Sequence, residues 1–294
     1  MQSAADGARP RRLAVVGVQT GFSPAGTDGQ YNYQQRRAAL RQTWFPASQR
    51  ALDRFEADSS IVIRFVIGHS DNAAMEADIM KEERLYGGFW RLPLQEGYSG
   101  LTAKTLMFLT AAARRYNARY IVKVDDDVYL RVARLPPAVQ QWTQDGAEYV
   151  GCMKTGDIVT SPEWRWFEPQ HQMLGSKSYF THAWGSIYVV SGAVAEDLAS
   201  RRPGSLRQFT NEDVTLGSWM LAMNITFRDE RRLCENDCTA TSIAVYDMPK
   251  CAGLCNPAEQ LVRLHTSEAC QAPPLDPATN TLPELPPIFQ FSKG

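Results

Sequence analysis

Three consecutive carboxylates, Asp125, Asp126 and Asp127, are the residues of this sequence best suited to chemistry. Adjacent carboxylates repel one another, so a chain keeps three of them together either in solvent or around a cation. Hard divalent ions such as Mg²⁺ and Mn²⁺ take oxygen ligands, and they often share those ligands with the phosphates of a substrate. A solvated acidic turn is the alternative interpretation of an isolated acidic run.

The segment just before the acids predicts a buried strand. Ile121, Val122 and Val124 are β-branched and apolar, which suits a strand covered on both faces. Lys123 interrupts the run and predicts that the burial is incomplete. Because ligands of α/β sheets bind at the carboxyl ends of strands, we predict a site for a metal and a diphosphate where this strand ends.

Predicted strands and helices alternate in the chain before the acids. The strands are expected at 13–19, 61–68 and 87–94, and the helices at 34–46, 73–85 and 99–116. This alternation predicts a mainly parallel, Rossmann-like sheet. No G-x-G-x-x-G motif follows the first strand, which argues against a dinucleotide cofactor.

A second acidic pair, Glu212 and Asp213, lies in the part of the chain after the three acids. We expect strands at 148–154, at 186–192 and from Asn224, and helices at 132–143, at 193–200 and after a cap at Thr210 or Asn211. Glu212 and Asp213 fall in the first turn of this last helix, where acids cap the helix and complement its dipole. Catalysis is the alternative role for the pair.

Arginines and aromatic residues offer further candidate contacts. Arg37 and Arg41 are four residues apart, so they project from one face of the first predicted helix. They are either two solvated arginines or a clamp for a phosphate or nucleotide. The aromatic stretch 155–185, which includes Trp184, is either core or a platform for a sugar ring.

Composition excludes several classes of protein. The chain has 294 residues, 44% hydrophobic and 21% charged, with a net charge of −1. This balance argues against a nucleic-acid-binding surface. No apolar run approaches the ~20 residues of a membrane span, and no signal peptide is visible. We therefore expect a chain that is either soluble as given or separated from an N-terminal anchor.

Six cysteines are present, and five of them follow residue 233. This crowding predicts disulfides and an oxidising compartment, with the pairing left open. A structural zinc site at Cys234-x3-Cys238 and Cys251-x3-Cys255 is the alternative. Asn224-Ile225-Thr226 matches an N-glycosylation sequon.

Taken together, these motifs resemble glycosyltransferase family 31, the β-1,3-galactosyltransferases and related enzymes. The resemblance covers residues 13–270. Its pieces are RRAALRQTW (36–44), FVIG (65–68), GLTAKT (100–105), YIVKVDDDVYL (120–130) and NEDVTLGSW (211–219). The stretch FTHAWGSIYVVSG (180–192) is most similar to the plant and algal branch, which includes hydroxyproline O-galactosyltransferases.

The resemblance implies a fold and a set of partners. The fold would be GT-A, an α/β fold with a Rossmann-like mixed sheet, helices on both faces and here a disulfide-rich C-terminal segment. The catalytic domain would span 13–270, between a flexible segment at 1–12 and a Pro-rich tail at 271–294. A UDP-sugar donor, Mn²⁺ or Mg²⁺, and a glycan or glycoprotein acceptor are implied. A type II membrane protein of the Golgi or endoplasmic reticulum is also implied, with its anchor absent from this chain.

Site residues follow from the resemblance, position by position. Asp213 matches the catalytic base of an inverting enzyme. The implied metal ligands are Asp127, Asp125 and His265, and the implied donor contacts are Arg37, Arg41, Lys104, Asp125 and Asp126. The family's acceptor-side segment is replaced here by HAWGSIYVVSG, so the acceptor contacts that we expect, Trp184 and Glu212, come from the residues and not from the resemblance.

The expected activity is transfer of galactose from UDP-galactose, with a β linkage, to a sugar hydroxyl or to hydroxyproline. UDP-N-acetylglucosamine and UDP-glucose are alternative donors. A non-catalytic binding or chaperone module on the same fold is the alternative from another class, although the presence of both Asp127 and Asp213 argues against it. A calcium-binding or lectin-like domain is disfavoured because no EF-hand loop is present.

Overall fold

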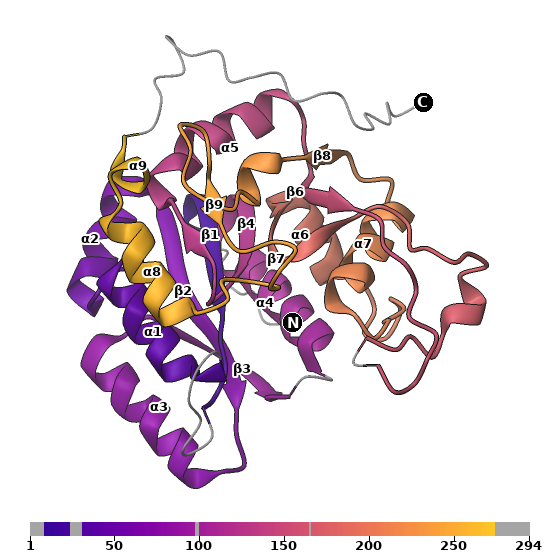
Figure 1. The fold of residues 1–294 in the computed structure, drawn as a ribbon, viewed down its shortest axis with the longest axis horizontal. Helices are drawn as coiled ribbons and strands as arrows, with labels where there is room; N and C mark the ends of the chain where they lie inside the picture. Colours follow the sequence, from indigo (N-terminus) through magenta and orange to yellow (C-terminus); the bar gives the residue numbers. More distant parts are fainter. Residues whose placement is uncertain (1–8, 24–30, 98–99, 165, 274–294) are drawn as a thin grey trace, which may run out of the picture.

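A seven-stranded sheet forms the centre of the computed structural model, which describes residues 9–23, 31–97, 100–164 and 166–273 (Figure 1). The strand order is β3-β2-β1-β4-β7-β6-β8. The strands are β1 (Arg11–Gln19), β2 (Ile61–His69), β3 (Phe89–Gln95), β4 (Asn117–Asp125), β6 (Tyr149–Lys154), β7 (His182–Ser191) and β8 (Phe227–Asp229). β5 (Tyr129–Leu130) and β9 (Ala244–Val245) pair separately.

The first four strands are parallel neighbours, as the alternation of strands and helices predicts. The second half of the sheet is mixed, because β7 runs antiparallel to both β4 and β6. β2 and β3 extend the sheet on one side of β1, and β4 lies on the other. The strand order therefore reverses between β1 and β4, and the carboxyl ends of such a pair border the ligand crevice of open α/β sheets.

Helices cover both faces of the sheet (Figure 1). One core contains Leu40, Trp142 and Leu261, and the other contains Phe108 and Trp219. The helices are α1 (Tyr33–Gln42), α2 (Gln49–Ser59), α3 (Ala73–Tyr86), α4 (Leu101–Arg115), α5 (Leu135–Gln144), α6 (Gly192–Ser200), α7 (Glu212–Ala222), α8 (Pro257–Thr266) and α9 (Glu268–Gln271). The predicted α/β class with helices on both faces is confirmed.

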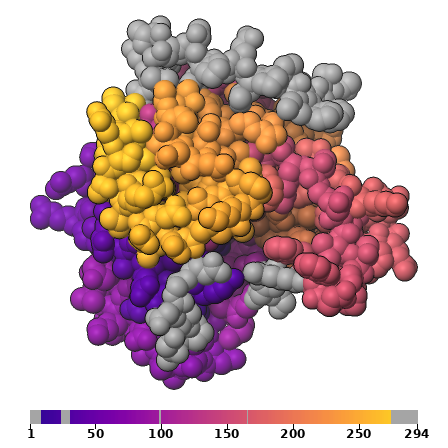
Figure 2. Space-filling model, viewed as in Figure 1, coloured from indigo at the N-terminus to yellow at the C-terminus, as the bar shows by residue number. Residues whose placement is uncertain are grey.

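The C-terminal segment folds back over the N-terminal half of the domain. α8 packs against α1, and Figure 2 shows the yellow C-terminal residues lying against the indigo and purple part of the surface. Disulfides Cys152–Cys234, Cys238–Cys270 and Cys251–Cys255 staple this segment. The disulfide-rich character is confirmed, and the zinc alternative is wrong because all six thiols are oxidised.

Some predicted details differ from the structure. Lys123 is only 5% exposed, so the prediction of incomplete burial was wrong; its ammonium pairs with Asp125 and donates to the Gly185 carbonyl oxygen. Asn224 does not open a strand but occupies a turn after α7, with φ of 54°, and β8 begins at Phe227. Helices α2 and α8 were not predicted.

The outer segments lie mostly outside the described residues. β1 begins at Arg11, two residues before the predicted boundary, and residues 1–8 are not described. Of the predicted tail, only 271–273 is described. Among the described helices, none combines the length and the apolar character needed to cross a membrane.

Candidate active site

Asp126 is the most deeply buried of the three acids, with 1% of its surface exposed. Its carboxylate accepts hydrogen bonds from Thr20 Oγ1 at 2.6 Å and from Arg36 Nη1 at 2.7 Å. Thr20 follows β1 and Arg36 lies in α1, so this carboxylate joins the ends of β1 and β4 to a helix. Asp126 thus has a structural role in which both of its oxygens are engaged.

Among the described residues, only one of the two carboxylate oxygens of Asp127 has a hydrogen-bond partner. Its Oδ2 accepts a hydrogen bond from Arg36 at 3.0 Å, whereas its Oδ1 is buried and has no hydrogen-bond partner in the described part of the chain. Burial raises the pKa of Asp127 to about 7, although Arg36 acts in the opposite direction. A buried carboxylate oxygen without a partner is costly, so this atom calls for a ligand.

Asp125 is paired with the lysine that interrupts β4. Lys123 Nζ lies 2.6 Å from Asp125 Oδ1, and it also donates to the carbonyl oxygen of Gly185 in β7. Burial alone would lower the pKa of Lys123, but Asp125 and Glu212 nearby outweigh it and raise that pKa. The ammonium is therefore charged and connects the end of β4 to Gly185 in β7.

The donor set at the end of β4 fits a hard divalent ion. Asp125 is about one-third exposed and Asp127 offers an unpartnered oxygen, so both could supply oxygen ligands. His265 instead contacts Tyr129, whose Oη lies 3.1 Å from the His265 Nδ1. Among the described residues, these three do not form a cluster with all ligand atoms within 4.8 Å of one another. A metal-binding role for His265 stays a prediction.

Arg37 and Arg41 were predicted to contact a phosphate or nucleotide, and in the structure both pair with an acidic side chain. Both are buried against Glu82 of α3, at 2.9 Å and 2.5 Å. Burial raises the pKa of Glu82, but the two guanidinium groups outweigh it and lower that pKa overall. Their shared helix face was predicted correctly, and it is occupied by a buried ion-pair cluster; contact with a donor stays a prediction.

Lys104 lies closer to the acids. It is 3% exposed, donates to the carbonyl oxygen of Thr20 at 2.6 Å and pairs with Glu96 at 2.7 Å. Burial lowers the pKa of Lys104. Its ammonium therefore supports the loop that follows β1, which borders the predicted donor site.

Gln19, the last residue of β1, was missed by sequence reasoning. It pairs in register with Asp125 of β4 and is 8% exposed. Neither the oxygen nor the nitrogen of its carboxamide has a hydrogen-bond partner in the ranges that the structure describes. A polar residue ending an otherwise apolar strand was the available signal. Its position suits a ligand with both a donor and an acceptor.

Asp213 begins a second group of polar residues at the N-terminus of α7. Lys154 Nζ lies 3.0 Å from Asp213 Oδ2, and His182 Nε2 lies 3.9 Å from the same oxygen. Burial alone would raise the pKa of Asp213, but Lys154 and His182 outweigh it, so that pKa is lowered. Burial lowers the pKa of His182, although the Asp213 carboxylate acts in the opposite direction.

Glu212 and Trp184, the predicted acceptor contacts, flank this group. Glu212 accepts a hydrogen bond from Tyr188 Oη, and burial raises the pKa of its carboxyl. The ammonium of Lys154 lies 3.9 Å from the centre of the Trp184 ring. One face of that ring is therefore occupied by a cation, so a sugar stacked on Trp184 would have to use the other face.

Lys123 and β7 connect the two groups of acids. Lys123 donates to the carbonyl oxygen of Gly185, and Gly185 packs against Asp213. A Cβ added at Gly185 would lie 3.5 Å from Asp213 Cβ. Asp125 and Asp213 are therefore linked through one buried ammonium and one backbone unit. That the end of β4 and the start of α7 form one site stays a prediction.

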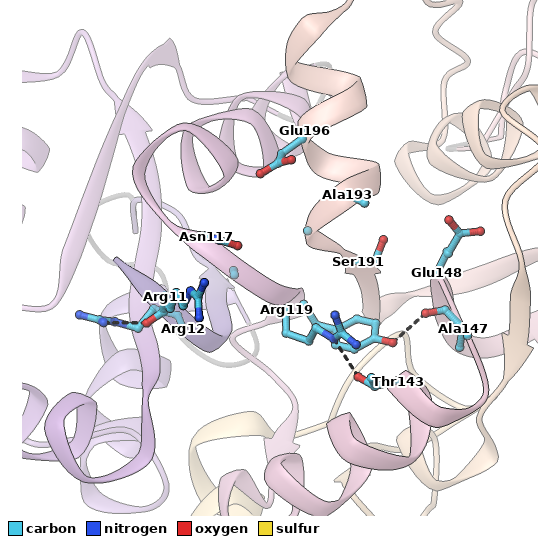
Figure 3. Close-up of a pocket in the computed structure, with 14 residues that line it drawn as sticks. Arg11, Arg12, Asn117, Arg119, Thr143, Ala147, Glu148, Ser191, Ala193 and Glu196 are labelled. Carbon is cyan, nitrogen blue, oxygen red and sulfur yellow. Dashed lines mark hydrogen bonds between the residues drawn. The ribbon is translucent and has the colours of Figure 1, made fainter. Parts of the chain in front are cut away.

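A hollow of about 570 Å³ lies at the opposite end of the sheet (Figure 3). Its lining includes the first residues of β1 and β4. Within it, the Arg119 side chain donates a hydrogen bond to Thr143 Oγ1. None of the predicted site residues lines it. The hollow therefore lies apart from the three acids at the carboxyl end of β4.

Comparison with known proteins decides the family. A model of the galactosyltransferase family matches residues 35–231. This chain belongs to the galactosyltransferase family. It is 44% identical to probable beta-1,3-galactosyltransferase 12 of Arabidopsis thaliana over 92% of this chain and 70% of the relative. It is 42% identical to probable beta-1,3-galactosyltransferase 13 of the same plant, over 92% of this chain and 76% of the relative.

This galactosyltransferase-family chain is a hexosyltransferase, and the resemblance to glycosyltransferase family 31 is confirmed. The residues matched by the family model include most of α1, the three acids and Asp213. Among solved structures, a glycosyltransferase involved in the glycosylation of the major capsid of PBCV-1 is 9% identical, with a TM-score of 0.40 over 86% of this chain and 99% of that chain.

Replacement of Lys123 by Met tests the link between the two acid groups. The variant leaves the Asp125 carboxylate and the Gly185 carbonyl oxygen without their shared donor. We expect the free energy of unfolding, measured by urea denaturation, to fall by about 1–3 kcal/mol. Lys81→Met on the exposed side of α3 is the control, with an expected change within about 0.5 kcal/mol. Equal stability of the two variants would contradict the link.

Proposed function

We propose that this hexosyltransferase takes galactose from UDP-galactose, requires Mn²⁺ or Mg²⁺, and transfers the sugar with inversion to a hydroxyl of a glycan or glycoprotein. The observation that best supports the metal is the buried Oδ1 of Asp127, which has no hydrogen-bond partner in the described chain. It lies at the β1–β4 switch point, where α/β sheets bind their ligands.

Asp127 and Asp125 would hold the divalent ion, which when bound neutralises charge that develops on the leaving diphosphate. The role of Asp126 and Arg36 in this scheme is to orient Asp127, since Arg36 bridges the two carboxylates. Lys104 positions the loop after β1. Gln19 would offer its carboxamide to the nucleotide, since both of its polar atoms lack partners in the described residues.

Asp213 is proposed as the base that removes the proton of the acceptor hydroxyl. Its lowered pKa keeps the carboxylate ionised at neutral pH, which is the form that a base requires. Lys154 contributes to that lowered pKa and holds one carboxylate oxygen at 3.0 Å. Inversion requires one such base and in-line attack on the donor from the side opposite the leaving group.

The acceptor and the compartment are part of the proposal. The names of the two Arabidopsis relatives support a β-1,3 linkage to a sugar, with hydroxyproline as the second acceptor to be tested. Three disulfides support an oxidising compartment, which in the secretory pathway is the lumen of the endoplasmic reticulum or Golgi.

A donor screen tests the proposed substrate. UDP-galactose, UDP-N-acetylglucosamine and UDP-glucose would each be supplied with Mn²⁺ and either a β-galactoside or a hydroxyproline peptide. We expect transfer chiefly from UDP-galactose and only when the metal is present. Preference for another UDP-sugar would replace the donor, and full transfer in excess chelator would contradict the metal.

Asp127→Asn removes the charge that the divalent ion requires while nearly preserving shape. We expect UDP affinity in Mn²⁺, measured by calorimetry, to fall at least about tenfold, toward the affinity measured in chelator. Asp53→Asn, at an exposed position of α2, should bind UDP as the wild type does. If Asp127→Asn keeps the wild-type dependence on Mn²⁺, Asp127 does not hold the metal.

Asp213→Asn removes the proposed base. We expect kcat to fall by at least about a hundredfold, because general-base catalysis contributes on the order of 10²–10⁴. UDP affinity should stay near the wild-type value, because Asp213 is assigned to the acceptor side. A parallel loss of UDP binding and activity would instead indicate that the carboxylate only caps α7.

Lys154→Met tests how the pKa of Asp213 is set. Removing the ammonium removes an interaction that lowers this pKa, so the acid limb of the pH profile of kcat/KM should move to higher pH. Lys177→Met, at an exposed lysine of the 155–181 segment, is the matched control and should leave the profile in place. A shift to lower pH would contradict the assignment.

A further inference from the structure

A five-residue ring lies against Asp127. The ring is 251–255, with sequence Cys-Ala-Gly-Leu-Cys, and the disulfide Cys251–Cys255 closes it. The backbone N–H of Leu254 donates to the carbonyl oxygen of Asp127 at 2.8 Å. A segment that follows Asp127 by more than a hundred residues thus contacts it directly.

Gly253 is the ring residue closest to the Asp127 carboxylate. A Cβ added at Gly253 would lie 2.2 Å from both Cγ and Oδ1 of Asp127, and 2.6 Å from Oδ2. Real Cβ atoms essentially never come within 3.0 Å of a non-bonded heavy atom, so a side chain at 253 would force the Asp127 carboxylate or the ring to shift. The φ angle of Gly253 lies outside the left-handed range, and therefore the close approach, not the backbone conformation, requires glycine.

The ring is also anchored on its other sides. Ser186 Oγ, in β7, donates to the carbonyl oxygen of Ala252. The Asp247 carboxylate accepts from the N–H of Cys255 at 2.8 Å, and its carbonyl oxygen accepts from the N–H of Cys251 at 2.7 Å. Because Ser186 directly follows Gly185, the ring contacts the same part of β7 that lies under the proposed base.

We propose that the Cys251–Cys255 ring is a wall of the divalent-cation site and that Gly253 positions the Asp127 carboxylate within it. Arg36 donates a hydrogen bond to Oδ2, and Gly253 packs so closely on the carboxylate that a Cβ there would overlap Cγ and both oxygens. The carboxylate of this proposed metal ligand is thereby restricted in its orientation. This inference rests on the proposed metal-dependent function and extends it to residues outside the acidic run.

The proposal predicts what a single methyl group will do. A Cβ at position 253 must displace either the Asp127 carboxylate or the ring, since the disulfide and the anchors at Ser186 and Asp247 hold the ring in place. Groups that orient a metal ligand typically change metal affinity by 10- to 100-fold when they are altered. Loss of the ring closure should act in the same direction.

The test compares Gly253→Ala with wild type in the full chain. Mn²⁺ affinity would be measured by electron paramagnetic resonance, and UDP affinity in saturating Mn²⁺ by calorimetry; neither readout depends on turnover. We expect Gly253→Ala to weaken both affinities at least about tenfold. A double variant, Cys251→Ser with Cys255→Ser, should also weaken Mn²⁺ binding while the protein remains folded by circular dichroism.

Two matched controls separate this effect from general damage. Gly156→Ala adds the same methyl group where nothing lies within 4 Å, so both affinities should stay at the wild-type values. Cys238→Ser with Cys270→Ser removes a different disulfide, and it should lower thermal stability while leaving Mn²⁺ affinity unchanged.

The outcomes distinguish a failure of the proposed metal-dependent function from a failure of the proposed role of the ring. If wild type binds UDP equally in Mn²⁺ and in chelator, the metal-dependent function is wrong and the role of the ring falls with it. If wild type requires Mn²⁺ but folded Gly253→Ala binds as tightly, only the role of the ring is wrong. Should Gly253→Ala fail to fold, the cysteine double variant decides, and wild-type affinity in that variant overturns the proposal.

Discussion

The buried ammonium of Lys123 is the interaction on which the rest of the site depends. It is 5% exposed and lies between the Asp125 carboxylate and the Gly185 carbonyl oxygen. Removing the Asp125 carboxylate would leave the buried Lys123 ammonium without its charged partner, which costs more than the net gain from forming the contact. Lys123 therefore holds Asp125 at the end of β4 and Gly185 in β7 at a fixed separation. Because Gly185 lies under Asp213, this contact also sets where the proposed base stands relative to the acids.

Three adjacent residues of one type acquire different chemistry from their surroundings. Asp126 is satisfied by Thr20 and Arg36 and serves the scaffold. Asp127 shares Arg36 but keeps one oxygen unpartnered among the described residues, and burial raises its pKa to about 7. Asp125 pairs with Lys123 and stays partly exposed. Asp125 ends β4, whereas Asp126 and Asp127 lie in the turn after it, so the three neighbours meet partners from different segments.

The parts of the site that the sequence predicted are those with a local signal. The apolar run before Asp125 predicts a buried strand, and the acids after it mark its carboxyl end. The spacing of Arg37 and Arg41 predicts their shared helix face but says nothing about Glu82, which reaches that face from α3. Clustering of cysteines likewise predicts disulfides without revealing their pairing. A contact between distant segments leaves no periodicity in either of them, which is why these partners could not be foreseen.

By itself, the sequence determined the α/β class, the family, the location of the acids at a strand end and the oxidised C-terminal segment. These properties follow from burial patterns and motif spacing, which neighbouring residues encode directly. Only the tertiary structure decided that Lys123 is fully buried, that Asp127 keeps an unpartnered oxygen, and that Gly253 packs on its carboxylate. Each of these depends on how separate elements pack together, because burial and close approach are properties of assembled surfaces and not of any single segment.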